Sequence, residues 1–218
     1  MERKNLSLYI HIPFCVKKCD YCDFLSFPAT DEIRAAYVEA LIGEIKTYQN
    51  TEMARRFVPT VFIGGGTPSV LSALRFGRIL KSIDEVFGID SKTEVSMELN
   101  PGTVTKEKCI ELCKLGVNRF SIGLQSPEDR FLKKLGRIHN WEQFINTYRW
   151  LREAGAENIN IDLMGGLPGQ SVEEYLKGLH KVIELQPEHI SAYSLIIEEG
   201  TPFYELYGEE IDTDGLHN

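Results

Sequence analysis

The stretch LSLYIHIPFCVKKCDYCDF, residues 6–24, joins the pattern of a β-strand directly to a group of cysteines. Apolar and polar residues alternate over 6–12, which predicts a strand with one apolar and one polar face. The cysteines follow as C-x3-C-x2-C, and they are Cys15, Cys19 and Cys22. Three thiols are one too many for a disulfide and one too few for a closed tetrahedral metal site. The stretch therefore raises the question of what binds here and what fills the fourth position.

A strand pattern followed by a helical period recurs along the chain. We expect strands at 6–12, 60–65, 94–99, 119–125, 158–164 and 189–195. We expect helices at about 31–49, 72–87, 105–115 and 172–185, with helical segments over about 127–154. Strands that alternate with helices imply parallel βα units with right-handed crossovers.

Helix boundary signals support this division of the chain. Gly88, Gly116 and Gly155 stand where three of the expected helices end, as left-handed terminators do. Ser171 opens the last expected helix with Glu174 three residues later, which is the pattern of a capping box.

The polar residues of these strands favour a barrel over a doubly wound sheet. Parallel strands covered on both faces are apolar nearly throughout, but here polar residues take every second position in several strands. They include Tyr9, His11, Glu98, Asn100, Ser121, Gln125, Asn160 and Asp162. Polar side chains on a buried face cost free energy unless they are paired or hydrated. We therefore expect an α/β fold, an open (βα)6 partial TIM barrel whose interior holds ligand and water.

The carboxyl ends of the expected strands carry unusual sequences. After the cysteines come GGGTPS (64–69), ELNPG (98–102), GLQS (123–126), DLMGGLPGQ (162–170) and SLIIEEGTP (194–202). Glycine, proline and asparagine also occur in ordinary βα turns. In barrels of βα units, however, functional residues gather at this end, and we expect the site there.

Composition and charge narrow the classes of function. The net charge of -8, without a basic tract, argues against a nucleic-acid partner held through phosphates. The first residues contain only a short apolar run broken by His11, and nothing longer resembles a membrane span. We expect no transmembrane segment and a cytoplasmic location, where clustered cysteines hold a metal or do chemistry. Cys109 and Cys113, in a separate helix, are predicted to be small buried apolar residues.

Zinc and an iron–sulfur cluster both suit closely spaced thiolates. Structural zinc takes four protein ligands, usually as two spaced pairs, and the sequence has no second C-x-x-C pair. His11 would complete a Cys3His set only from the strand, outside a paired knuckle. A four-iron cluster normally takes four cysteines. Three would leave one iron open to a small molecule with donor atoms.

C-x3-C-x2-C after the first strand of a βα barrel resembles the radical S-adenosylmethionine (SAM) superfamily. The resemblance implies that Cys15, Cys19 and Cys22 bind three irons of a [4Fe-4S] cluster. The amino and carboxylate groups of S-adenosylmethionine would then chelate the fourth iron. An electron from the reduced cluster would cleave the sulfonium and yield a 5′-deoxyadenosyl radical, while the protein supplies positioning and excludes competing chemistry.

Further residues match the cofactor site of this family. GGGTP (64–68) is similar to its glycine motif, in which Gly65 and Gly66 let the backbone approach the methionine end and Thr67 follows. The resemblance also implies cofactor contacts at Glu98, Gln125, Arg137, Asp162 and Ala192, with Tyr9 and Tyr21 flanking the cluster. From the segment KKLGRIH alone, Arg137 would be interpreted as a solvated surface arginine.

Six stretches together resemble the oxygen-independent coproporphyrinogen III oxidase group: LYIHIPFCVKKCDYCDF, FIGGGTPSVL, ELNPGTV, GVNRFSIGLQS, LGRIH and DLMGGLPGQ. True oxidases of this group carry a further cysteine two positions after the third, where this chain has Phe24. That residue is typical of the haem chaperone (HemW-like) branch. The resemblance then implies a protein that keeps the cluster and S-adenosylmethionine, binds haem as cargo for haem-accepting proteins and does not decarboxylate. The alternative is a radical SAM oxidase of porphyrin biosynthesis; either would need an electron donor.

Two expectations concern haem and the end of the chain. Histidine is a common haem ligand, and the candidates are His11, His139, His180, His189 and His217, each of which also fits an ordinary structural or surface role. Residues 1–205 are expected to form the radical SAM core, and 206–218 to begin a connection to a C-terminal domain. Because proteins of this group continue past the barrel, we expect that domain to be missing and the chain to be truncated.

Overall fold

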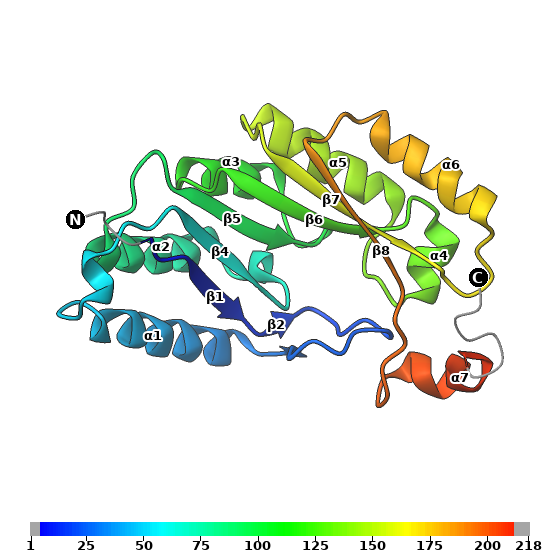
Figure 1. Cartoon of the computed structure of the whole chain (residues 1–218), viewed down its shortest axis with the longest axis horizontal. Helices are drawn as coiled ribbons and strands as arrows, with labels where there is room; N and C mark the ends of the chain where they lie inside the picture. The colour runs from blue at the N-terminus through cyan, green and yellow to red at the C-terminus, as the bar shows by residue number, and fades with distance from the viewer. Residues whose placement is uncertain (1–4, 212–218) are drawn as a thin grey trace.

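The computed structural model describes residues 5–211 and is built around a six-stranded parallel sheet (Figure 1). Its strands are β1 (Leu8–Ile12), β4 (Thr60–Gly65), β5 (Glu94–Leu99), β6 (Arg119–Gln125), β7 (Ile159–Gly165) and β8 (His189–Ser194). They lie side by side in chain order, β1-β4-β5-β6-β7-β8. A doubly wound sheet would reverse direction at a switch point, and this one does not. The predicted open (βα)6 partial barrel is confirmed, with β1 and β8 as its edges.

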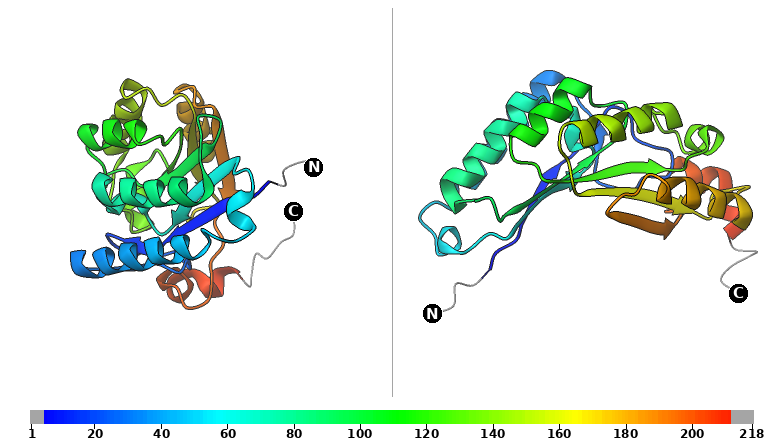
Figure 2. Two further views of the ribbon diagram at one scale, coloured as in Figure 1. Left: turned by 90° about the vertical axis from the view of Figure 1, so that its left-hand side faces the viewer. Right: turned by 90° about the horizontal axis from the view of Figure 1, so that it is seen from above.

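Six helices lie between successive strands of this sheet. They are α1 (Asp31–Thr47), α2 (Ala73–Phe87), α3 (Lys106–Lys114), α4 (Asp129–Lys134), α5 (Trp141–Glu153) and α6 (Val172–Ile183). Figure 2 shows α1, α2, α3 and α5 along one side of the curved sheet. The apolar positions of the strands meet these helices, so that Ile12, Ile63, Phe120 and Ile161 are fully buried. The alternate, polar positions are left for the other face.

The helix caps predicted from the sequence are present. Ser171 and Glu174 form the capping box of α6, in which the Ser171 hydroxyl accepts from the Glu174 N–H and the Glu174 carboxylate accepts from the Ser171 N–H. Gly88 ends α2 with a left-handed φ of 68°. These local signals explain why the predicted ends of most elements agree with the structure to within two residues.

The expected helical segments over 127–154 are α4 and α5. Gly136 ends α4 with a φ of 70°, and Asn140 opens α5 through a capping box with Gln143. The turn between the helices packs against the cysteine loop, because a Cβ atom at position 136 would lie 2.5 Å from Asp20 Oδ2. This turn carries Arg137 toward the cysteines.

Several short elements carry too little periodicity to be predicted. The two-residue strands β2 (Phe14–Cys15) and β3 (Phe27–Pro28) pair with each other, and 3-10 turns η1 (Met53–Arg55) and η2 (Pro68–Val70) precede β4 and α2. Helix α7 (Pro202–Ile211) follows β8. The predicted boundary at residue 205 falls inside α7, and residues 212–218 of the predicted connection lie outside the described residues.

Helix α7 closes a second, smaller apolar cluster beside the cysteine loop. Its buried members are Phe131, Leu135, Met164, Leu167 and Phe203, and Tyr21 packs against them. The rings of Tyr21 and Phe203 meet edge to face at 6.4 Å, and the Phe203 N–H donates to the Asp20 carbonyl oxygen at 3.0 Å. The cysteine loop is therefore held by residues from three distant parts of the chain.

The remaining cysteines agree with the sequence interpretation. Cys109 is fully buried and Cys113 is half-buried, each within helix α3. Burial raises the pKa of the Cys109 thiol to about 12, as expected of an inert packing residue. Across residues 5–211, no helix combines the length and the apolar character that a membrane span requires.

Candidate functional site

The three clustered cysteines face one cavity at the carboxyl end of the sheet. Cys15 ends the short strand β2, and the Cys22 N–H donates to the Cys19 carbonyl oxygen at 3.1 Å, which folds the loop back on itself. All three thiols line a cavity of about 180 Å³. The loop sequence thus gathers three donors at the end of the barrel where function was expected.

Eight other predicted site residues line the same cavity: Tyr21, Gly65, Gly66, Thr67, Glu98, Gln125, Arg137 and Asp162. They come from the cysteine loop, from β4 and the turn after it, from β5, β6 and β7, and from the turn after α4. Polar alternation along the strands accounts for Glu98, Gln125 and Asp162. The cavity is therefore the polar interior that the strand pattern predicts.

Two predicted site residues are not brought to this cavity. Tyr9 lies earlier on β1, where it is largely exposed, stacks on Phe62 and meets His11 Nδ1 through its hydroxyl group at 3.1 Å. Ala192 of β8 lines a separate cavity with Tyr175 of α6, and the neighbouring Tyr193 lines both cavities. Neighbouring residues of a strand point to opposite faces, so the side chain of Ala192 points away from that of Tyr193.

The three thiols that line the cavity are of the ligand type that an iron–sulfur cluster takes. Such a cluster distributes its cysteines over separate irons. His11 does not complete a Cys3His set, because its Nδ1 lies 3.1 Å from the Tyr9 hydroxyl and its Nε2 lies 3.1 Å from the Leu25 carbonyl oxygen. The donor set therefore suits a cluster held by three thiolates.

The glycine motif packs the end of β4 against the cysteine strand. A Cβ atom on Gly65, whose φ is 114°, would lie 2.6 Å from the His11 ring, and one on Gly66 would lie 2.7 Å from the Phe14 carbonyl oxygen. The Thr67 N–H donates to that same carbonyl oxygen at 2.7 Å. Because of this close approach, Thr67 Oγ1 lies 3.5 Å from Cys15 Sγ.

Two carboxylates face the cavity from β5 and β7. Glu98 accepts from the Gly65 N–H at 3.0 Å, and burial raises the pKa of its carboxyl group while this hydrogen bond lowers it. Burial likewise raises the pKa of Asp162, opposed by hydrogen bonds from Asn160 and Ser121. Carboxylates of this kind accept hydrogen bonds from hydroxyl or ammonium groups of a ligand.

Arg137 is half-buried beside the cysteines, not solvated at the surface. Its Nη1 lies 3.7 Å from Cys19 Sγ and 3.4 Å from the Tyr21 hydroxyl. Its Nη2 donates to Asn100 Oδ1 and to the Gly123 carbonyl oxygen, each at 2.5 Å. The buried Nε atom has no partner among the described residues. A guanidinium in this position brings a fixed positive charge next to the thiols.

Other cavity residues were not assigned from the sequence. They are Lys17, Phe24, Ser26, Leu99, Asn100, Ser121, Gly123, Met164 and Tyr193. The sequence carried a signal for three of them. Asn100 and Ser121 are polar positions in the strand alternation, and Tyr193 lies on the same face of β8 as His189 and Ser191. Only the fold shows which of these positions reach the cysteines.

None of the histidines within residues 5–211 lines the cysteine cavity. His139 is buried with neither ring nitrogen hydrogen-bonded, and burial lowers its pKa to about 3. His180 and His189 are exposed, and His189 contacts Asn160. His217 lies outside the described residues. A haem ligand among them stays a prediction.

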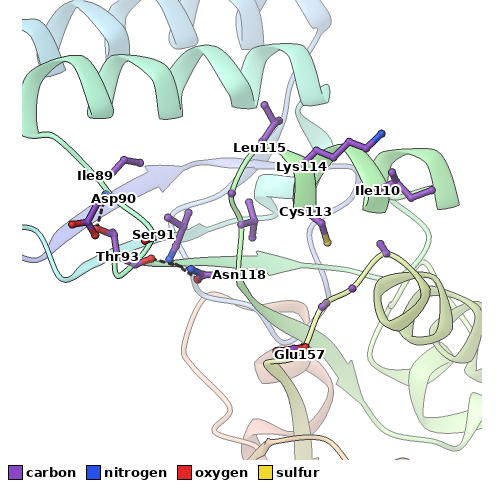
Figure 3. Close-up of a pocket in the computed structure, with 16 residues that line it drawn as sticks. Ile89, Asp90, Ser91, Thr93, Ile110, Cys113, Lys114, Leu115, Asn118 and Glu157 are labelled. Carbon is purple, nitrogen blue, oxygen red and sulfur yellow. Dashed lines mark hydrogen bonds between the residues drawn. The ribbon is translucent and has the colours of Figure 1, made fainter.

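A larger cavity of about 660 Å³ lies at the opposite end of the strands (Figure 3). It is formed by the turns before β5, β6 and β7, and its polar groups serve those turns. Asn118 Oδ1 accepts from the Val95 N–H at 2.8 Å, and its Nδ2 donates to the Thr93 carbonyl oxygen at 2.9 Å. Active sites of βα barrels lie at the carboxyl ends of the strands. We therefore do not assign the functional site to this cavity, although it is larger.

The chain is similar to several curated proteins. The chain is 43% identical over 199 residues to "Heme chaperone HemW" of Escherichia coli (strain K12), with 91% of this chain and 52% of the relative covered. It is 40% identical over 202 residues to "Heme chaperone HemW" of Bacillus subtilis (strain 168), with 92% and 53% covered. The chain thus spans about half the length of the curated relatives it matches.

Solved structures share the fold. The structure titled "Coproporphyrinogen III oxidase (HemN) from Escherichia coli is a Radical SAM enzyme" matches with a TM-score of 0.81 and 27% identity, covering 97% of this chain and 52% of that one. Methylornithine synthase (PylB), at 15% identity and a TM-score of 0.63, shows the fold alone.

The sequence profile of the radical SAM superfamily matches residues 9–182, well over half of the chain. This span begins within β1, includes the cysteine loop and the glycine motif, and ends within α6. The chain belongs to the radical SAM superfamily.

Proposed function

We propose that the chain binds a [4Fe-4S] cluster through Cys15, Cys19 and Cys22, and S-adenosylmethionine beside it, as part of a haem chaperone of the HemW kind. The family implies both cofactors. The gathering of the three thiols in one cavity with the glycine motif supports their placement here. The names of the relatives support the chaperone function.

The chain's own residues would hold and orient these cofactors. When bound, the cluster supplies an electron for cleavage of the sulfonium of S-adenosylmethionine. Gly65 and Gly66 leave backbone surface open to the cavity, while Glu98 and Asp162 offer acceptors to hydroxyl or ammonium groups. Arg137 offers positive charge to a carboxylate, and its Nε atom has no partner among the described residues.

Phe24 is the observation that favours the chaperone over the oxidase. It occupies the position where the oxidases carry a further cysteine, and its side chain is 69% exposed. An apolar groove of about 260 Å³ adjoins the cysteine cavity and is lined by Phe24, Met164, Leu195 and Ile196, among others. Apolar walls of this kind suit one face of a flat tetrapyrrole, which supports haem as the cargo.

Further proposals concern partners and location. Reduction of the cluster needs an electron donor, and delivery of haem needs accepting proteins. The five cysteines of the chain are all unpaired in the structure, which suits a reducing compartment. We therefore place the protein in the cytoplasm, and its net charge of -8 gives no support to a nucleic-acid partner.

Anaerobic reconstitution with iron and sulfide, followed by haem titration and a coproporphyrinogen turnover assay, tests this function. We expect iron–sulfur absorption, haem binding and no decarboxylation. Cys15→Ala should abolish the absorption, whereas Cys109→Ala, at a buried helical cysteine outside the cavity, should leave it unchanged. Decarboxylation of coproporphyrinogen would instead establish the oxidase, and absorption that survives Cys15→Ala would refute the ligand assignment.

A further inference from the structure

Asn100 joins the hydrogen-bond partners of two of the clustered cysteines. Its Nδ2 donates to Thr67 Oγ1 at 2.8 Å, and Thr67 Oγ1 lies 3.5 Å from Cys15 Sγ. Its Oδ1 accepts from Arg137 Nη2 at 2.5 Å, and Arg137 Nη1 lies 3.7 Å from Cys19 Sγ. An unbroken chain of hydrogen bonds therefore runs from one thiol to the other through a single carboxamide.

The chemistry of the groups fixes the direction of every hydrogen bond between the two thiols. A guanidinium only donates hydrogen bonds, so the Asn100 oxygen must face Arg137 and the Asn100 amino group must face Thr67. Thr67 Oγ1 accepts from that amino group, which leaves the hydroxyl hydrogen free for Cys15. A metal-bound thiolate has no hydrogen and only accepts. Both sulfur atoms would therefore receive hydrogen bonds.

The surroundings hold Asn100 in this orientation. Its backbone carbonyl oxygen accepts from the Thr103 hydroxyl at 2.6 Å, and its backbone N–H donates to Ser69 Oγ at 3.4 Å. A Cβ atom on Gly123 would lie 2.6 Å from Asn100 Oδ1 and 3.0 Å from Arg137 Nη2. Thr67 itself is only 2% exposed. The glycine leaves the space that this pair occupies, and burial shields the donors from competing water.

We propose that Asn100, through Thr67 and Arg137, raises the reduction potential of the cluster by directing hydrogen bonds to two of its thiolates. Hydrogen bonds to the sulfurs and local charge are among the features that set the potentials of such clusters. The reduced cluster carries one more negative charge, so donors stabilise it more than the oxidised form. This inference rests on the cluster of the proposed function and requires neither S-adenosylmethionine nor haem. Asn100 is a positioning residue in this role.

The test is a redox titration of the reconstituted 218-residue chain, followed by electron paramagnetic resonance, without S-adenosylmethionine. Thr67→Val keeps the shape of the side chain and removes the donor to Cys15. We expect a roughly tenfold fall in the ratio of reduced to oxidised cluster at a fixed potential, which is about 59 mV for one electron. Thr67→Ser, which restores the hydroxyl group, should return the potential to the wild-type value.

Asn100→Asp tests the direction of the hydrogen bonds between Asn100, Thr67 and Cys15. A carboxylate only accepts, so it would draw the Thr67 hydroxyl hydrogen away from Cys15 and lower the potential. Asn50→Asp, at an exposed turn, controls for the change in net charge of the protein and should have no effect. Part of the Asn100→Asp effect should disappear in the Thr67→Val background, because the two residues act through one bond.

The outcomes distinguish a failure of the proposed function from a failure of this inference. A wild-type chain that takes up no iron would refute the cluster and this inference together. Full iron content with an unchanged potential in Thr67→Val would refute the inference and leave the proposed function intact. If Thr67→Val fails to hold iron, Arg137→Lys keeps the charge but loses the two-pronged geometry; an unchanged potential there would refute the inference equally.

Discussion

The hydroxyl group of Tyr193 donates to Oε1 of Gln125 at 2.7 Å, across the cavity end of the sheet. Their strands, β8 and β6, are not neighbours, since β7 lies between them. Gln125 has a φ of 72°, in the left-handed region that non-glycine residues rarely adopt, at a register shift between β6 and β7. Strained backbone of this kind persists when its surroundings hold it, and it clusters at functional sites.

Tyr193→Phe should therefore destabilise the chain modestly and loosen the Gln125 side chain. Burial raises the pKa of the Tyr193 hydroxyl to about 12, so the group is protonated and can donate at neutral pH. Loss of one such bond costs about 1 kcal/mol in the free energy of unfolding. Chemical denaturation measures it, with Tyr204→Phe on the exposed side of α7 as control. Equal effects of both substitutions would argue against the bond.

His139 should make stability depend on pH. Burial lowers its pKa from the ordinary 6.5 to about 3, so the unfolded chain binds more protons between these values. Stability from this group is complete above pH 6.5 and falls as the pH drops toward 3, by about 1.4 kcal/mol per unit at most. Within residues 5–211 neither ring nitrogen of His139 has a hydrogen-bond partner, so His139→Leu should flatten the curve without loss of stability at pH 7. His180→Leu, at an exposed position, is the control; a slope that His139→Leu leaves unchanged would contradict the prediction.

Gly123→Ala should disturb the cysteine cavity without disturbing the sheet as a whole. The added methyl group would lie 2.6 Å from Asn100 Oδ1 and 3.0 Å from Arg137 Nη2, so the pair must separate. Overpacking of this kind costs about 1–3 kcal/mol. Reconstitution should show less iron per chain, while far-ultraviolet circular dichroism stays the same. Gly43→Ala, where a Cβ atom meets nothing within 4 Å, is the matched control.

Phe203→Ala should weaken the hold of α7 on the cysteine loop. Phe203 is 1% exposed and lies against Tyr21, so its truncation should cost about 3–5 kcal/mol. Amide hydrogen exchange should accelerate more in residues 19–22 than in β5 or β6. Leu206→Ala, on the exposed side of the same helix, should leave exchange unchanged; uniform acceleration throughout the sheet would mean that Phe203 supports the whole fold equally.

The sequence was most informative where a local pattern repeats. Alternation in the strands predicted both the barrel and the cavity residues Glu98, Gln125 and Asp162, because side-chain direction along a strand follows from the backbone alone. The boundary between the helical segments of 127–154 was not located from the sequence, because one glycine and one cap, not the apolar pattern, separate α4 from α5. Asn100 was visible only as one more polar position, since its partners Thr67 and Arg137 lie far away in the chain. Tyr9 and Ala192 were predicted from the family resemblance, and neither lines the cysteine cavity.

The apolar cluster beneath the cysteine loop also has a consequence for biosynthesis. A ribosome releases Cys15, Cys19 and Cys22 early, but Phe203, which packs against Tyr21, leaves it about 180 residues later. At a synthesis rate of roughly 5–20 residues per second, the contact between Phe203 and the cysteine loop forms about 10–40 s after the loop is made. Insertion of the proposed cluster into an ordered loop would thus be a late step in biosynthesis.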